Sequence, residues 1–180
     1  MEVRMENLPL LCTYAGLAGV AFAIAMAIVV KAAPAGNERM NEIADAVKAG
    51  AIAYLNRQAK SMGAAGIVLA AIIYFAPGYG LYATAGFVIG AIASFMAGYI
   101  GMRVSVIANV RTAEASRHGL NAGLRMAFKG GTVTGMIVAG LALTVCAGLY
   151  TFLVAEGVEA KEINVALVAL GFGGSLISIF

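Results

Sequence analysis

The chain has 180 residues, of which 62% are hydrophobic and only 12% are charged. Soluble globular domains carry roughly a quarter charged residues, so this composition excludes an ordinary soluble domain and indicates lipid as the solvent. The formal net charge is only +3, and no basic cluster lies beside stacking aromatic residues, so we expect no nucleic-acid partner.

Five apolar runs predict an all-α membrane protein that forms a single transmembrane region, 1–180. The predicted helices cover residues 8–30, 58–76, 81–108, 126–155 and 163–180. A helix needs roughly 20 apolar residues to cross a bilayer. The first, third and fourth runs meet this length, the second is short, and the fifth is still apolar at Phe180. We therefore expect about five transmembrane helices.

A secretory signal peptide is the weaker alternative for the first run. Ala32 to Ala35 resembles a cleavage site, which keeps this alternative open. However, a signal peptide begins with a positively charged segment, and here Glu2 and Glu6 offset the charge of that segment. The apolar run is also longer than the usual 7 to 15 residues.

The basic residues predict how the helices are oriented. The connections 31–57 and 109–125, with their flanking turns, contain ten of the twelve lysines and arginines, namely Lys31, Arg39, Lys48, Arg57, Lys60, Arg103, Arg111, Arg117, Arg125 and Lys129. Only Arg4 and Lys161 fall on the other side. The positive-inside rule places the ten in the cytoplasm, so we expect the N-terminus outside the cell.

The segment after the first run has the pattern of an amphipathic helix that merges into the second span. Asn37 is a suitable N-cap and Glu38 suits the first turn. Apolar residues then recur at helical spacing at Met40, Ile43, Val47, Ala51, Tyr54 and Leu55. We interpret this as a helix that lies on its neighbours, with a membrane-surface anchor as the alternative.

Small residues at intervals of four predict close helix packing. The third run contains Gly86, Gly90, Ser94 and Gly98, and the fourth contains Gly131, Gly135 and Ala139 together with Gly140, Thr144 and Gly148. Cys12 and Cys146 lie in apolar runs and are interpreted as small core residues.

The chain offers little site chemistry, and we predict no catalytic, cofactor-binding or metal-binding residue in it. No ionisable residue lies in the middle of an apolar run, which disfavours a proteolipid-like ring subunit. The segment 171–174 is glycine-rich but apolar, so helix packing is favoured over a phosphate cradle, and His118 is interpreted as a surface residue. The basic tract Arg103, Asn109, Arg111 and Arg117 is interpreted as topology and lipid-headgroup contact, with attraction of anions to a nearby active site as the alternative.

Four groups of motifs resemble the membrane-integral pyrophosphatases. Residues 36–44 and 50–58 resemble the first cytoplasmic segment of that family, and 98–102 with 108–115 resemble the end of its third helix. Residues 127–131 with Gly135 and 140–141 resemble the start of the fourth helix, and 171–175 with 179–180 the fifth. The order of the motifs agrees with the family over nearly the whole chain.

The resemblance implies a pyrophosphate-energised ion pump of about sixteen helices, usually a homodimer, in the cell (plasma) membrane. Such a pump hydrolyses pyrophosphate with Mg²⁺ on the cytoplasmic side and moves protons or sodium outward, and a requirement for K⁺ stays open. The family's catalytic motifs begin just past its fifth helix, so no catalytic residue is carried over. We therefore expect the chain to be an N-terminal portion of such a pump, with its first four helices in an outer ring. Its partner would be the remainder of its own polypeptide. We expect the portion to be inactive alone. A complete small membrane protein acting as a packing or assembly subunit is the alternative.

Overall fold

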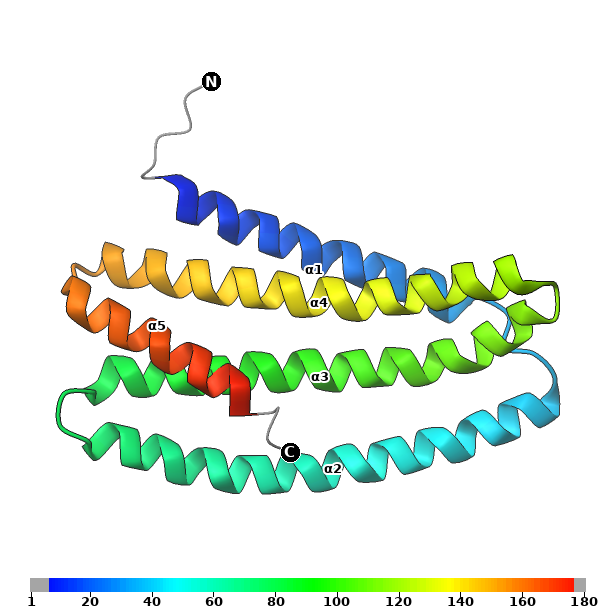
Figure 1. The fold of residues 1–180 in the computed structure, drawn as a ribbon, viewed down its shortest axis with the longest axis horizontal. Coiled ribbons are helices and arrows are strands. Elements are labelled where there is room, and N and C mark those ends of the chain that lie inside the picture. Colours follow the sequence, from blue (N-terminus) through cyan, green and yellow to red (C-terminus); the bar gives the residue numbers. More distant parts are fainter. Residues whose placement is uncertain (1–6, 177–180) are drawn as a thin grey trace.

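The computed structural model describes residues 7–176, and the elements in that range are α-helices without a strand. They are α1 (Leu8–Ala32), α2 (Glu38–Phe75), α3 (Gly80–Ser116), α4 (Leu120–Ala155) and α5 (Ala160–Ser175). Figure 1 shows an elongated bundle in which α3 lies between α2 and α4, α1 packs on α4, and α5 packs on α3. The helices α1 to α4 are each long and apolar enough to cross a membrane.

Two spans are longer than the sequence predicted, and the amphipathic helix predicted after Asn37 is continuous with the second span, as expected. The helix expected at 58–76 begins at Glu38, the one expected at 81–108 continues to Ser116, and the one expected at 126–155 begins at Leu120. At 1.5 Å per residue each measures about 55 Å, whereas the hydrocarbon core is roughly 30 Å thick. The segments 38–57, 109–116 and 120–125 are therefore helical extensions of the spans. The apolar spacing from Met40 to Leu55 predicted the first of them, whereas hydropathy misses the other two because it reports burial in lipid and not helix formation in water.

The fifth helix differs from its prediction at its beginning. We expected it at 163–180, and α5 begins three residues earlier, at Ala160, and is described to Ser175. Residues 177–180 lie outside the described residues.

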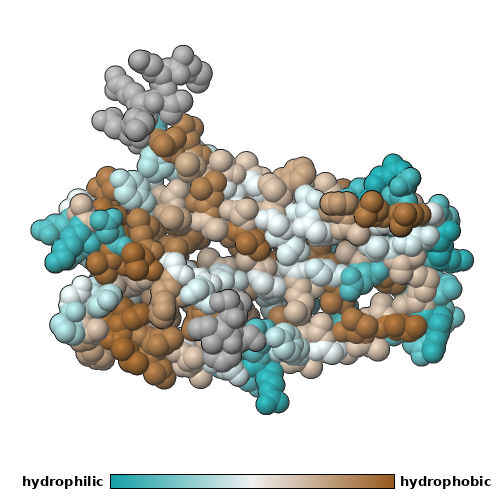
Figure 2. Space-filling model, in the orientation of Figure 1, coloured by the Kyte–Doolittle hydropathy of each residue, from teal (hydrophilic) through white to brown (hydrophobic). Residues whose placement is uncertain are grey.

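Small residues form much of the core between the helices. One buried cluster joins α1, α3 and α4 through Ala23, Val30, Ala97, Ala108, Val133 and Ile137. A second joins α3 and α5 around Phe87 and Ala169. Helix α2 is the least covered, and side chains such as Ile67 and Phe75 are exposed. Figure 2 shows apolar and neutral surface over much of the bundle, with hydrophilic residues at both ends and one hydrophilic group that projects between them. Such a surface suits contact with lipid or further helices.

Some of the predicted small-residue stripes form contacts between helices. A Cβ on Gly140 of α4 would lie 2.8 Å from the carbonyl oxygen of Gly16 in α1. A Cβ on Gly86 or Gly90 of α3 would overlap backbone carbonyl oxygens of α5. In contrast, Gly98, Gly131 and Gly135 have open space beside them. The stripe that includes Gly140 therefore holds α1, and part of the α3 stripe holds α5.

Candidate functional site

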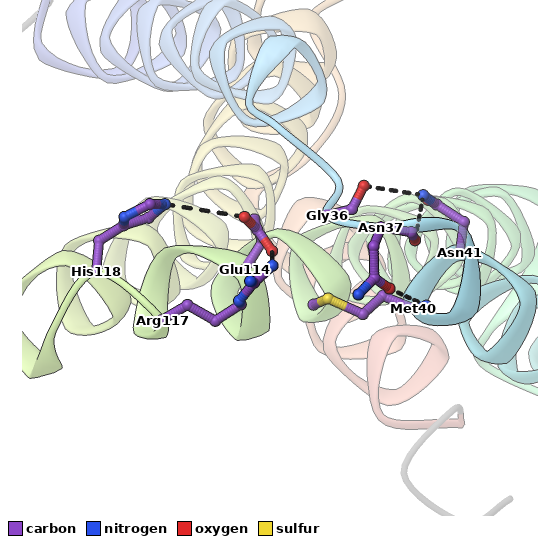
Figure 3. A network of polar contacts seen from close by, with 7 residues as sticks. All are labelled: Gly36, Asn37, Met40, Asn41, Glu114, Arg117 and His118. Atoms are coloured by element: carbon purple, nitrogen blue, oxygen red, sulfur yellow. Dashed lines mark hydrogen bonds and ion pairs between the residues drawn. The ribbon is translucent and has the colours of Figure 1, made fainter.

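A polar corner forms where the α1–α2 connection meets the end of α3 (Figure 3). Gly36 precedes α2 with a φ of +82°, a conformation that glycine adopts without a Cβ penalty. Asn37 follows as the N-cap of α2, and its Oδ1 accepts a hydrogen bond from the Met40 backbone N–H at 2.9 Å. Asn41 Nδ2 donates to the Asn37 carbonyl oxygen at 3.0 Å. The motif at 36–41 is therefore a helix-initiation device, and the predicted N-cap is confirmed.

Glu114, near the end of α3, provides the second set of contacts at the polar corner. Its carboxylate accepts a hydrogen bond from Arg117 Nη1 at 3.1 Å and lies 3.8 Å from His118 Nε2. The Glu114 side chain is only 15% exposed, and Figure 3 shows it facing the Gly36 loop. A Cβ on Gly36 would lie 3.0 Å from Glu114 Oε2 and closer still to the sulfur of Met40. Gly36 thus leaves room for the carboxylate to lie against the connection.

Arg111 links α3 to the C-terminal end of α1. Its Nη2 donates to the carbonyl oxygen of Lys31 at 2.8 Å, and its Nη1 donates to the Ile107 carbonyl oxygen in its own helix at 3.0 Å. The Nε is buried without a hydrogen-bond partner in the described part of the chain. Because the last carbonyls of a helix lack intrahelical partners and carry partial negative charge, a guanidinium is a favourable partner there.

The structure does not gather the predicted basic tract into one site. The Arg103 guanidinium lies over the Tyr99 ring, 5.3 Å from its centroid, while Arg111 binds α1 and Arg117 pairs with Glu114. Asn109 lies along two shallow cavities and is exposed. Each member of the tract therefore has a different environment.

Sequence reasoning missed a second grouping of cations. Lys31, Lys48 and Arg103 come from α1, α2 and α3 and line one cavity. The sequence could have placed two of them at the same level of the bundle, because Lys31 and Arg103 are each the first charged residue after a long apolar run. Lys48 could be added only once the packing of α2 on α3 was known.

Lys60 lies farther from the basic end of the bundle than Lys48 or Arg103 does. The neighbouring residue Ala59 lines the same cavity as Phe95, which is well inside the apolar run of α3. The apolar stretch of α2 from Ser61 to Phe75 is correspondingly short, about 22 Å by its helical rise. A lysine at this depth is accommodated when its stem lies along apolar surface and its ammonium reaches the interface.

The remaining residues singled out in the sequence are structural. Gly173 packs against the backbone of Phe87, whereas Gly171 and Gly174 have open space, so this segment contributes to helix packing. Cys12 is half-buried and Cys146 is exposed, and both are free thiols. The prediction that Cys146 is a core residue is therefore wrong, because it lines an open cavity between α3, α4 and the end of α5.

The arrangement holds α1 against α3 and places cations around one cavity. No group of three or more His, Cys, Asp or Glu side chains within residues 7–176 is placed to hold a metal ion. The residues present therefore do not fit a Mg²⁺ site.

Comparison with known proteins identifies the family of the chain. The family described as inorganic H⁺ pyrophosphatase matches residues 17–180. A K(+)-insensitive pyrophosphate-energized proton pump from Methanosarcina mazei is 43% identical over 176 residues, which cover 98% of this chain and 25% of that protein. A pump of the same name from Caldanaerobacter subterraneus subsp. tengcongensis is 38% identical over 161 residues, covering 81% of this chain and 23% of that protein.

A putative K(+)-stimulated pyrophosphate-energized sodium pump from Clostridium tetani is 38% identical over 132 residues, covering 73% of this chain and 19% of that protein. The chain thus spans about a quarter of the length of the curated relatives that match nearly all of it. The resemblance seen in the ordered motifs is confirmed: this chain is a multi-pass membrane protein that belongs to the inorganic H⁺ pyrophosphatase family.

Proposed function

We propose that this chain is the N-terminal portion of a pump that couples cytoplasmic pyrophosphate hydrolysis to the movement of an ion out of the cell. The observation that carries the proposal is the family match over residues 17–180, together with relatives named as pyrophosphate-energised pumps. These relatives are about four times longer than the chain, so the proposal assigns catalysis to the rest of the polypeptide.

Within such a pump the chain has a scaffolding role. Its helices pack through glycine contacts, and the polar corner joins α1, α2 and α3 at the basic end. We place Mg²⁺, and pyrophosphate with it, on residues beyond this chain, because the described His, Cys, Asp and Glu side chains form no group that could hold a metal ion. The proposal also includes a homodimer in the plasma membrane, with the N-terminus outside and the basic end in the cytoplasm.

Protons are the favoured ion, without a requirement for K⁺. The relatives that cover nearly the whole chain, at up to 43% identity, are named K(+)-insensitive proton pumps. Sodium transport with K⁺ stimulation is the second candidate, because the Clostridium tetani relative carries that name at 38% identity.

Inverted membrane vesicles test the proposal. Vesicles that contain the whole polypeptide should hydrolyse pyrophosphate with Mg²⁺ and acidify their interior, at the same rate with and without K⁺. Acidification that needs sodium and K⁺ would replace the proton pump with the sodium pump. Residues 1–180 produced alone should hydrolyse pyrophosphate no faster than empty vesicles. Robust turnover by residues 1–180 would overturn the assignment of catalysis, and inactivity of the whole polypeptide would favour the packing or assembly subunit.

A further inference from the structure

A cavity of about 430 Å³ opens between α1, α2 and α3 at the basic end of the bundle. Three of its lining residues are cationic, and each comes from a different helix: Lys31, Lys48 and Arg103. No acidic side chain lines it, and the remaining walls are apolar, including Leu55 and Ile107. We propose that this cavity binds the phosphate of an anionic phospholipid. The proposal goes beyond the proposed pump function and does not depend on it.

The three cations are available for a ligand. Their side chains form no hydrogen bond or ion pair with the residues that the structure describes, in contrast to Arg39 and Arg117, which pair with carboxylates of their own helices. Asp45 lies one turn before Lys48 on α2 and makes no ion pair with it. Three like charges around one cavity repel one another, and a phosphate between them removes that cost.

Neighbouring contacts leave these side chains without another role and restrain one of them. Arg111 satisfies the Lys31 carbonyl oxygen, so the C-terminal end of α1 does not need the Lys31 or Arg103 side chain as a partner. The Arg103 guanidinium rests over the Tyr99 ring, a cation–π contact that limits its freedom. Binding then costs less side-chain entropy than it would for fully mobile cations.

The position of the cavity at the edge of the apolar runs favours a lipid over a free anion as its ligand. Lys31 and Arg103 directly follow the apolar runs of α1 and α3, so both lie where hydrocarbon gives way to water. Lipid phosphates lie at that level, and basic pockets between transmembrane helices on the cytoplasmic side suit anionic headgroups. The apolar walls suit the glycerol and upper acyl carbons, which inorganic phosphate lacks. An anionic lipid is favoured over a zwitterionic one because it brings no ammonium group into a site that already holds three cations.

Lipid retention by the purified whole polypeptide tests the proposal. The variant K31Q/K48Q/R103Q removes the cavity cations, and R125Q/K129Q/K161Q is its matched control, with two lysines and one arginine removed from exposed positions outside the cavity. Native mass spectrometry in detergent would follow phosphatidylglycerol and phosphatidylcholine titrated onto each protein. A phosphatidylglycerol with a photoreactive acyl chain would map the position of the bound lipid. Far-ultraviolet circular dichroism and gel filtration would establish that both variants fold.

We expect phosphatidylglycerol to bind the unmodified protein more tightly than phosphatidylcholine and to label the cavity walls near Leu55 and Ile107. The cavity variant should bind phosphatidylglycerol roughly tenfold or more weakly, whereas the control should change by less than about threefold. Equal losses in the two variants would overturn the proposal, because they would show general surface attraction. Displacement of phosphatidylglycerol by inorganic phosphate or pyrophosphate at matched ionic strength would also overturn it, because the cavity would then be a site for a free anion.

Discussion

The guanidinium of Arg111 donates a hydrogen bond to the carbonyl oxygen of Lys31 at 2.8 Å, across 80 positions of sequence. The contact joins the C-terminal extension of α3 to the last turn of α1. A second bond from Arg111 to Ile107 holds the side chain against its own helix. One arginine therefore holds the end of α1 against α3.

Replacing Arg111 with methionine should destabilise the protein by about 1–3 kcal/mol, because the Lys31 carbonyl loses a charge-assisted partner while the apolar stem is retained. Thermal unfolding of the purified protein in detergent would show a lower midpoint. The control is R125M, since Arg125 is exposed and donates to Asn121 in its own helix. Equal midpoints for the two variants would contradict a structural role for the link between α3 and α1.

Replacing Gly140 with alanine should separate α1 from α4. The new Cβ would lie 2.8 Å from the Gly16 carbonyl oxygen and 3.0 Å from the Val20 nitrogen, and backbone atoms cannot rotate away as a side chain does. We expect a loss of about 1–3 kcal/mol, measured by chemical or thermal unfolding in detergent.

The matched control for Gly140 is G135A in the same helix, where the added Cβ meets nothing within 4 Å. That variant should be neutral or gain up to about 1 kcal/mol, because alanine favours the helix over glycine. A loss in G135A as large as in G140A would show that this face of α4 is also packed in the purified protein.

Replacing Asn37 with alanine should weaken the start of α2 by about 1 kcal/mol, because the Met40 backbone N–H loses its acceptor. Asn37→Asp keeps an acceptor oxygen and should retain most of the stability. Hydrogen exchange of the amides in the first turn of α2 would report the difference locally. Faster exchange in both variants would contradict the capping role.

The proposed orientation predicts opposite labelling of the two ends of the bundle. In a background with Cys12 and Cys146 replaced by alanine, a cysteine at Glu159 should react with an impermeant maleimide added to intact cells. A cysteine at His118, which is 75% exposed, should react only after permeabilisation. The opposite pattern would invert the proposed topology and place the basic end outside.

Sequence reasoning succeeded where a local property of the chain, such as its composition over one helix length, determines the structure. The apolar runs predicted membrane helices because transfer into hydrocarbon depends on composition over roughly 20 residues. The cap at Asn37 was predictable because it depends on atoms only three residues apart. The ordered motifs predicted the family, and the family match over residues 17–180 confirmed it.

Only the tertiary structure decided which of several similar residues contact another helix and which do not. Gly135 and Gly140 look equivalent in the sequence, yet only Gly140 lies against another helix, because the choice depends on which face of α4 receives α1. Likewise, Lys31, Lys48 and Arg103 are separate surface charges until the packing of α2 on α3 brings them around one cavity. Local composition determines that a segment is a helix and that it enters a membrane. Close packing between segments distant in sequence determines which of its residues meet.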